Sequence, residues 1–328
     1  MRRELLSLLV CPKCEGSFEL HVYDADGAHV VEGALSCVAC RSIFKITRGI
    51  PRILPDTLNQ GKDATSDAFG YEWSHYSELA DTDKKEFLGW MSPLTPSDFE
   101  DRVVLDAGCG KGRHSLLSAQ FGARTVVGID LSVAVEAAYR NTRHLDNVHI
   151  VQADILNLPF KRPFDLVYSV GVVHHLPSPA EGFASLVKHV KPGGRISVWV
   201  YGKEGNAWIE KIVDPVRKNV TSKLPRPVTR FIAFFPATIL YVALKLLYRP
   251  AKNIGWLKKL LPYSEYLCFI SDYSFAENWW NVFDQLVAPT AFYVSQDEVA
   301  SWFSAASLKQ VAISRHNNNS WRGTGVMP

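Results

Sequence analysis

Residues 103–114 of this 328-residue chain have the sequence VVLDAGCGKGRH, an apolar run, an acid and three glycines before a polar stretch. This pattern is typical of a buried strand that ends in a tight turn before a helix, where glycines let the backbone pass close to a ligand. Asp106 stands directly before the first glycine, where a carboxylate would repel a pyrophosphate but could attract an ammonium group. The spacing of Gly108, Gly110 and Gly112 also differs from the Gly-x-Gly-x-x-Gly of dinucleotide-binding loops.

Short apolar runs alternate with helical stretches on the carboxyl-terminal side of this loop. The strands that we expect cover residues 103–105, 125–129, 148–151, 164–169 and 195–201. Helices are expected to begin at Ser132, at Ser178 with Pro at the first helical position, and at Ser295 with Glu298 three residues later. This alternation predicts βαβ units and a parallel sheet in an α/β fold.

Acidic residues follow the next two expected strands. Asp130 ends the second strand, where a carboxylate can hold both hydroxyls of a ribose. Asp154 follows the third strand, where it suits the amino group of an adenine. His174 and His175 follow the fourth strand, and Lys-Pro-Gly-Gly precedes the fifth strand.

Together these motifs, over about residues 100–202, resemble the class I S-adenosylmethionine-dependent methyltransferases, most closely the branch of the quinone-biosynthesis methyltransferases. The resemblance implies a Rossmann-like seven-stranded sheet with helices on both faces, S-adenosylmethionine as cofactor and S-adenosylhomocysteine as product. It places at the cofactor Asp106, Gly108, Gly110, Gly112, Asp130, Leu131, Asp154, Ile155 and Ser169. The aromatic segment 69–73 looks like a part of such enzymes that folds over the cofactor, which adds Tyr71 and Trp73; docking against the next domain is the alternative.

Methyl transfer is an in-line displacement at a sulfonium, so alignment and desolvation can supply most of the acceleration. A base is needed only if the acceptor loses a proton. His174 and His175 lie at the correct edge of the expected sheet and are the candidate bases. The alternative is that one histidine caps the following turn and the other packs beneath it.

Four of the six cysteines form two CxxC pairs, Cys11 with Cys14 and Cys37 with Cys40. Two such pairs supply the four thiolates of a tetrahedral zinc site, and a ribbon of this size needs the metal in order to fold. With four protein ligands the zinc would be structural. Two disulfides or four idle thiols are the alternatives.

The cysteine pairs, together with Gly33 to Ser36 and Ile46 to Pro55, resemble the small zinc-ribbon activator subunits that bind tRNA, rRNA and release-factor methyltransferases. The resemblance covers about residues 1–56. It implies that the ribbon is fused here to its catalytic domain and leaves a further protein partner open.

The expected fifth strand is followed by an insertion of about 90 residues, and long insertions on a catalytic scaffold often carry specificity. Residues 203–262 hold twelve Lys or Arg and three acids, a net charge of +9 in a chain whose total is +3. Within them, residues 231–248 are almost wholly apolar. An anionic membrane surface, a helical lid packed on the protein, and RNA are the three candidate functions of this region. Residues 263–298 hold six acids and ten aromatics, which suits a flat or amphipathic small molecule or a lid core.

The predicted divisions are a zinc ribbon (1–56), a linker and aromatic helices over the cofactor (57–100, with the linker at 56–67), the cofactor-binding core (101–202), a helical lid insertion (203–294) and the last core elements (295–328). We expect a methyltransferase acting on a small lipophilic acceptor at O, N or C. An RNA methyltransferase and an inactive, cofactor-binding adaptor are the alternatives. Pro236 and Lys245 argue against a spanning helix, so we expect a cytoplasmic protein with peripheral membrane association through residues 203–262 as one possibility.

Overall fold

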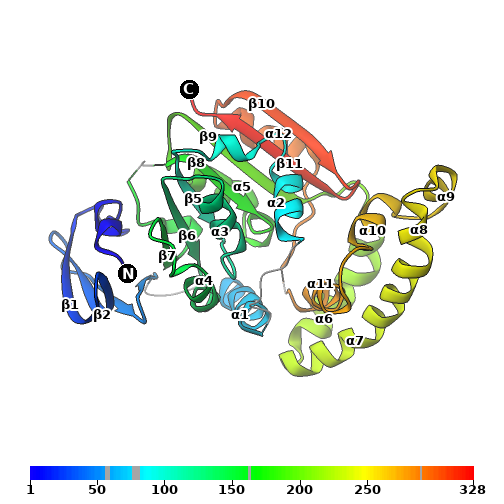
Figure 1. The fold of residues 1–328 in the computed structure, drawn as a ribbon, viewed down its shortest axis with the longest axis horizontal. Coiled ribbons are helices and arrows are strands. Elements are labelled where there is room, and N and C mark those ends of the chain that lie inside the picture. Colours follow the sequence, from blue (N-terminus) through cyan, green and yellow to red (C-terminus); the bar gives the residue numbers. More distant parts are fainter. Residues whose placement is uncertain (56–59, 76–81, 162–163, 289) are drawn as a thin grey trace.

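The computed structural model describes residues 1–55, 60–75, 82–161, 164–288 and 290–328. A β-rich ribbon, an α/β core and a helical arm follow one another along the longest axis, with the ribbon and the arm at opposite ends (Figure 1).

The core sheet has the strand order β7-β6-β5-β8-β9-β11-β10. Its strands are β5 (Val103–Ala107), β6 (Thr125–Asp130), β7 (Val148–Ala153), β8 (Phe164–Val170), β9 (Val190–Tyr201), β10 (Lys309–His316) and β11 (Ser320–Val326). The strands β7 to β9 are parallel, whereas β11 is antiparallel to both β9 and β10. The predicted seven-stranded Rossmann-like sheet is therefore confirmed, and the last two strands form a hairpin at its edge.

Helices cover both faces of this sheet because successive strand residues point to opposite sides. Val103 and Leu105 pack on the face of α5 (Pro179–Val187) and α12 (Gln296–Ala305). Val104 packs on the other face. That face is covered by α2 (Asp83–Met91), α3 (Arg113–Gln120) and α4 (Val135–Thr142).

The helix starts that were predicted from N-cap residues agree with the structure to different degrees. Ser178 caps α5, and Ser295 with Glu298 forms a capping box on α12. The helix expected at Ser132 begins three residues later, because the Ser132 side chain bonds Asp130 and the backbone of Ala134 in a turn.

The ribbon contributes four strands, β1 (Phe18–Asp26), β2 (His29–Cys37), β3 (Ile43–Thr47) and β4 (Ile50–Ile53), after the short helix η1 (Arg3–Ser7). Strand β4 pairs in parallel with β7, so the ribbon and the core share one sheet of eleven strands in the part of the chain that is described. Arg52 donates to Gln152 at 3.0 Å and forms an ion pair with Glu136. The ribbon is thus a docked edge of the catalytic sheet.

Helix α1 (Gln60–His75) occupies most of the segment that was predicted as a linker. The linker prediction is wrong from Gln60 onward, and residues 56–59 lie outside the described part. The helix is stabilised by tertiary packing, since Ala68 is buried in one cluster with Phe283 of the arm. This packing overrides the polar local sequence.

The insertion after β9 is helical. Its helices are α6 (Asp214–Asn219), α7 (Arg226–Ala243), α8 (Arg249–Ala251), α9 (Gly255–Leu260), α10 (Ser264–Ile270) and α11 (Phe275–Val287). A π-helical segment η7 (Leu244–Tyr248) joins α7 to α8, and a second one, η5 (Ile209–Val213), precedes α6. The remaining short helical turns are η2 (Pro96–Asp98), η3 (Ile155–Asn157), η4 (Val173–His175) and η6 (Thr221–Lys223). Helix α11 packs on α1 and on α7, whereas α8 and α9 lie at the end of the arm that is farthest from the core (Figure 1).

Candidate functional site

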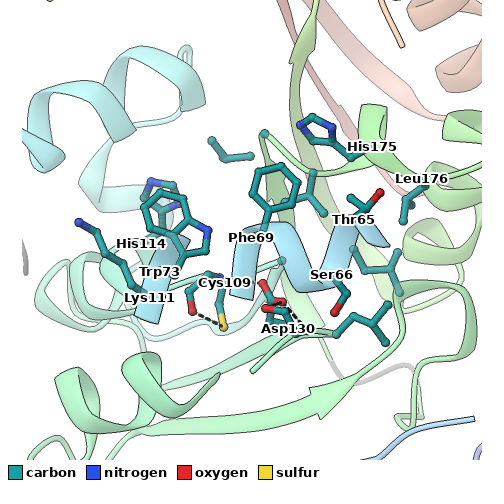
Figure 2. Close-up of a pocket in the computed structure, with 18 of the residues that line it drawn as sticks. Thr65, Ser66, Phe69, Trp73, Cys109, Lys111, His114, Asp130, His175 and Leu176 are labelled. Atoms are coloured by element: carbon teal, nitrogen blue, oxygen red, sulfur yellow. Dashed lines mark hydrogen bonds between the residues drawn. The ribbon is translucent and has the colours of Figure 1, made fainter. Parts of the chain in front are cut away.

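A pocket with a cavity volume of about 140 Å³ opens at the carboxyl ends of β5, β6, β7 and β8. From β5 the chain continues to β6 and β7 on one side of the sheet, and from β8 it continues to β9 on the other side. Ligands of open α/β sheets bind at such a switch point between two neighbouring strands. Helix α1 crosses the opening, with Phe69 and Trp73 above the loop of Cys109 and Asp130 (Figure 2). The pocket is lined by Thr65, Ser66, Phe69, Trp73, Gly108, Cys109, Gly110, Lys111, Arg113, His114, Asp130, Leu131, Ser132, Ala153, Asp154, Ile155, Val170, Gly171, Val172, His175 and Leu176.

The glycine loop after β5 forms one wall of the pocket. Gly108 has a φ of +89°, and a Cβ there would lie 2.3 Å from a methyl group of Val172. Gly110 has a φ of +51°, and a Cβ there would lie 3.2 Å from the indole nitrogen of Trp73. Both positions therefore need glycine, for backbone conformation and for space. Gly112 begins α3 and faces Ala138 instead of the pocket.

Asp130, at the end of β6, forms a hydrogen bond with this loop. Its carboxylate accepts from the backbone N–H of Gly110 at 3.0 Å, and from the N–H and hydroxyl of Ser132 at 2.8 and 2.7 Å. Burial raises the pKa of Asp130, and the three donors oppose that shift. The carboxylate lines the pocket at the carboxyl end of β6, where it can accept bonds from neighbouring hydroxyls of a ligand.

Asp106 and Ser169 lie beneath the loop, outside the pocket lining. Asp106 is 1% exposed and accepts a bond from the Ser115 hydroxyl at 2.7 Å. Burial raises its pKa to about 7. The Ser169 hydroxyl donates to the carbonyl of Ala107 at 2.8 Å. Both side chains therefore brace β5 and its turn, and residues 170–172, which follow Ser169, line the pocket.

Asp154 and Ile155 form the wall that follows β7. Asp154 accepts from the backbone N–H of Leu156 at 2.9 Å and caps η3. Leu131, which directly follows β6, also lines the pocket. The structure thus brings together the predicted residues Gly108, Gly110, Asp130, Leu131, Asp154, Ile155 and Trp73.

Helix α1 contributes Trp73, which the sequence analysis placed at the cofactor, together with Thr65, Ser66 and Phe69, which it did not assign. Thr65, Phe69 and Trp73 are spaced by four along the helix and point into the pocket, and Ser66 accompanies them. Tyr71, which we expected at the cofactor, is not among the lining residues; its ring stacks on His75 at 4.0 Å and lies 6.0 Å from that of Phe283. The spacing of four would have identified these residues if residues 60–67 had been taken as helix.

His175 is the predicted histidine that reaches the pocket. Its ring lies 4.9 Å from that of Phe69, and Nδ1 lies 2.6 Å from the carbonyl oxygen of Thr290. Because a carbonyl oxygen only accepts, Nδ1 must carry the proton, and Nε2 keeps a lone pair. Burial lowers the pKa of His175 to about 4, so the ring is neutral at physiological pH.

His174 lies behind His175 in a buried polar cluster, and it does not line the pocket. Its ring is 4.0 Å from that of Tyr201, and neither of its nitrogens has a partner among the described residues. The Tyr201 hydroxyl donates to Asp284 at 3.3 Å. Burial raises the pKa of Asp284 to about 6, and burial together with Asp284 raises the pKa of Glu72 well above its ordinary value. These groups extend the site from His175 toward α11.

The four predicted metal ligands converge in the ribbon. The sulfur atoms of Cys11, Cys14, Cys37 and Cys40 all lie within 4.8 Å of one another. Two of the pairs, Cys11 with Cys40 and Cys14 with Cys37, are 3.6 and 3.4 Å apart, close to the roughly 3.8 Å between thiolates that bind one zinc ion at about 2.3 Å. A Cβ at residue 16 would lie 2.9 Å from the Cys37 sulfur, so the glycine at this position leaves the space that the sulfur atoms need.

Comparisons with known proteins agree with both sites. A family profile described as "Methyltransferase domain" matches residues 104–194, and one described as "Trm112p-like protein" matches residues 2–49. The chain thus contains a class I S-adenosylmethionine-dependent methyltransferase domain behind an N-terminal Trm112-like zinc ribbon, and the four-cysteine cluster is consistent with zinc.

Among similar proteins is a tRNA U34 carboxymethyltransferase of Pseudoalteromonas atlantica, 34% identical over 110 residues, or 33% of this chain and 34% of that protein. Another tRNA U34 carboxymethyltransferase, from Cellvibrio japonicus, is 28% identical over 179 residues, or 50% of this chain and 55% of that protein. A solved putative S-adenosylmethionine-dependent methyltransferase from Listeria monocytogenes is 28% identical and aligns with a TM-score of 0.33 over 38% of this chain and 56% of that one. This chain therefore spans about a third to just over half of these relatives.

Proposed function

We propose that this chain is an S-adenosylmethionine-dependent methyltransferase, with the pocket above β5 to β8 as its cofactor site. The observation that carries the proposal is the cradle itself: two glycines with positive φ, at one of which a Cβ would also collide with Val172, and the Asp130 carboxylate beside them. This cradle lies within the residues that match the methyltransferase profile.

The residues present fit S-adenosylmethionine. Asp130 would hold the ribose hydroxyls, Asp154 and Ile155 the adenine, and the backbone at 108–110 and 170–172 the methionine part. When bound, the cofactor supplies a methyl group on a positively charged sulfur. Trp73 and Phe69 cover the pocket and exclude water from it, which favours a reaction in which charge is lost.

His175 is placed to take a proton from the acceptor. Thr290 fixes its tautomer, so that Nε2 is the free nitrogen. A base with a pKa of about 4 is weak, but an attacking hydroxyl becomes a strongly acidic oxonium once it carries the new methyl group. We therefore infer that proton transfer to His175 follows methyl transfer, and that the imidazole mainly orients the acceptor before it.

An RNA nucleoside is the acceptor that the comparisons support. The similar curated proteins are named for modifying a tRNA uridine, and a Trm112-like ribbon stands at the amino-terminal end of the described chain. This alternative has more support from the comparisons than the small lipophilic acceptor that we placed first from the sequence. The methyltransferase profile matches residues 104–194 and ends before the insertion.

A lipophilic small molecule is the second candidate, and a different observation favours it. The pocket side next to His175 is formed by Phe69, Val172 and Leu176, which offer an apolar surface. The arm that extends from this side carries a large exposed apolar surface. Neither feature is expected of a site that holds only a polyanion.

Transfer of a radiolabelled methyl group distinguishes these acceptors. Purified protein is incubated with labelled S-adenosylmethionine and either total tRNA or a total lipid extract, and label is counted in precipitated RNA and in the organic phase. The Asp130→Asn variant, which keeps the size of the side chain, is the control for background. Label in the RNA supports the nucleoside, label in the organic phase supports the lipophilic acceptor, and failure of the folded protein to bind S-adenosylmethionine refutes the proposed function.

A further inference from the structure

Helix α7 and the segment η7 that follows it carry a continuous apolar stripe that the described residues leave uncovered. The stripe consists of Val228, Phe231, Phe235, Ile239, Val242 and Leu246, at intervals of three or four residues. The exposed fractions of Ile239 and Leu246 reach 74% and 69%. Because intervals of three and four place side chains on one face of a helix, these residues form a single surface.

The opposite face of the same helix is fixed to the protein. Thr229, Ala233 and Ala237 are buried, and Ala233 packs with Trp280 and Phe283 of α11. Farther along, Leu244 and Tyr248 pack with Cys268 and Ile270 of α10. The helix is therefore apolar on both sides, with one side packed and the other free.

Exposed apolar side chains are concentrated in this part of the molecule. Of the 23 large apolar side chains exposed among the described residues, 16 lie between Trp208 and Leu260. They include a second stripe of Trp208, Ile212, Val216 and Val220, and the pair Trp256 and Leu260 in α9, at the far end of the arm. Contiguous patches of this kind mark interaction surfaces, and exposed tryptophans are frequent at the level of lipid headgroups.

The charges around these stripes identify the partner. Residues 203–262 carry a net charge of +9, whereas the rest of the chain carries −6. The exposed cations Lys211, Lys223, Arg249 and Lys259 form no ion pair within the described ranges. An apolar surface flanked by free cations is complementary to an anionic lipid surface. A second copy of this chain would bring two strongly positive surfaces together, and RNA would leave the exposed aliphatic stripe in water.

We propose that residues 203–262 form a membrane-docking arm that lies on an anionic lipid surface, with the apolar stripe of α7 and η7 inserted at the headgroup level. The inference goes beyond methyl transfer and depends on neither acceptor.

The packing contacts of α7 are the reason to place it along the surface. The helix from Arg226 to Ala251 has 26 residues, and its length and apolar composition would suffice to cross a membrane. However, the Lys245 ammonium donates to the carbonyls of Ser271 and Tyr273, at 2.8 Å each, and Arg230 lies over the ring of Trp279. Crossing the bilayer would break these contacts or draw the acids of α11 into hydrocarbon.

Flotation with lipid vesicles tests the proposal. The full-length protein is mixed with phosphatidylcholine vesicles that contain or lack phosphatidylglycerol, at low and high salt. We expect flotation with the anionic vesicles and weaker flotation with the neutral ones. The triple variant F235N/I239N/L246N, changed only at exposed positions, should lower the vesicle partition constant by at least about 100-fold, since each side chain contributes a sizeable apolar area.

A matched control distinguishes this surface from general hydrophobicity. Tyr23 and Ile43 are exposed apolar residues of the ribbon, 73% and 68% exposed. The variant Y23N/I43N should float like the wild type, and every variant should keep its affinity for S-adenosylmethionine. That affinity makes loss of vesicle binding distinguishable from loss of the fold and from failure of the proposed function.

Four results would overturn the proposal. The first is flotation of the triple variant equal to that of the wild type. The second is binding of tRNA through the arm, with no binding to vesicles. The third is a dimer in sedimentation that the triple variant dissociates, which would assign the stripe to a second copy. The fourth is resistance of the vesicle-bound protein to alkaline carbonate, which would mean that the helix spans the bilayer.

Discussion

Replacing Asp130 by Asn changes one atom at the centre of the cofactor cradle. In the structure the carboxylate accepts three hydrogen bonds, from the N–H of Gly110 and from the N–H and hydroxyl of Ser132. Asn has one acceptor oxygen and one amino group, so one donor must face another donor. A hydrogen bond to a charged partner contributes about 1.5–3 kcal/mol, and we therefore expect S-adenosylmethionine to bind about 2 kcal/mol more weakly, or roughly 30-fold.

Thermal denaturation with and without ligand measures this change. A ligand at about 100 times its dissociation constant stabilises a protein by about 2.7 kcal/mol, and a roughly 30-fold loss of affinity leaves under about 1 kcal/mol at the same concentration. Asp101→Asn, at an exposed residue before β5, is the matched control and should keep the full wild-type shift. Equal ligand-induced shifts for Asp130→Asn and the wild type would show that Asp130 does not hold the cofactor.

Three further predictions concern the metal, the acceptor and pH. Cys37→Ser should lose zinc and unfold the ribbon, with only a modest loss of S-adenosylmethionine affinity through the pairing of β4 and β7; full zinc content in that variant would contradict the ligand assignment. His175→Gln should slow methyl transfer by up to about 10²-fold at unchanged S-adenosylmethionine affinity, because the acceptor would lose the group that orients it; an unchanged rate would show that His175 has no part in the reaction. Burial lowers the pKa of His149 and His175 from 6.5 to about 4, so their contribution to the stability of the protein is complete above pH 6.5 and is lost as the pH falls toward 4. Burial raises the pKa of Glu86 and Asp106 to about 7, so their contribution is complete below about pH 4 and is lost as the pH rises through 7. The melting temperature should therefore pass through a maximum between pH 5 and 7, and a steady rise from pH 5 to 8 would contradict these shifts.

Local sequence patterns were sufficient to predict the core and the metal cluster. The strand before Gly108 and the acid at Asp130 carry their own signals, because a buried parallel strand is continuously apolar and its ligand-binding residues follow directly at its end. The four cysteines are equally local, since each CxxC pair is one turn of chain. The N-caps Ser178 and Ser295 were predictable for the same reason.

Contacts between distant segments were not predictable in this way. The pairing of β4 with β7 could not be predicted from the sequence, because no local pattern shows which strands of two domains will lie side by side. Helix α1 was taken for a linker up to Asp67 because its polar residues favour a loop locally, whereas its helical form depends on the burial of Ala68 against the arm.

In the insertion, amino-acid composition alone did not predict which residues contact the pocket, the protein or the solvent. The aromatic residues of 263–298 suited a substrate wall, but none of the described ones lines the cofactor pocket; Phe275 and Trp279 pack on Phe234 of α7 instead. Composition gave the positive charge and apolar character of residues 203–262 correctly. Only the structure shows which apolar residues face the protein and which face outward.

Calorimetric titration of the zinc-loaded wild-type protein with S-adenosylmethionine and S-adenosylhomocysteine, with metal analysis of the same sample, tests the central claim most directly. The structure predicts one binding site for each ligand at the same pocket, in competition with each other, and one zinc ion per chain. Absence of heat from both ligands in a folded, zinc-loaded sample would contradict the assignment of a working methyltransferase site.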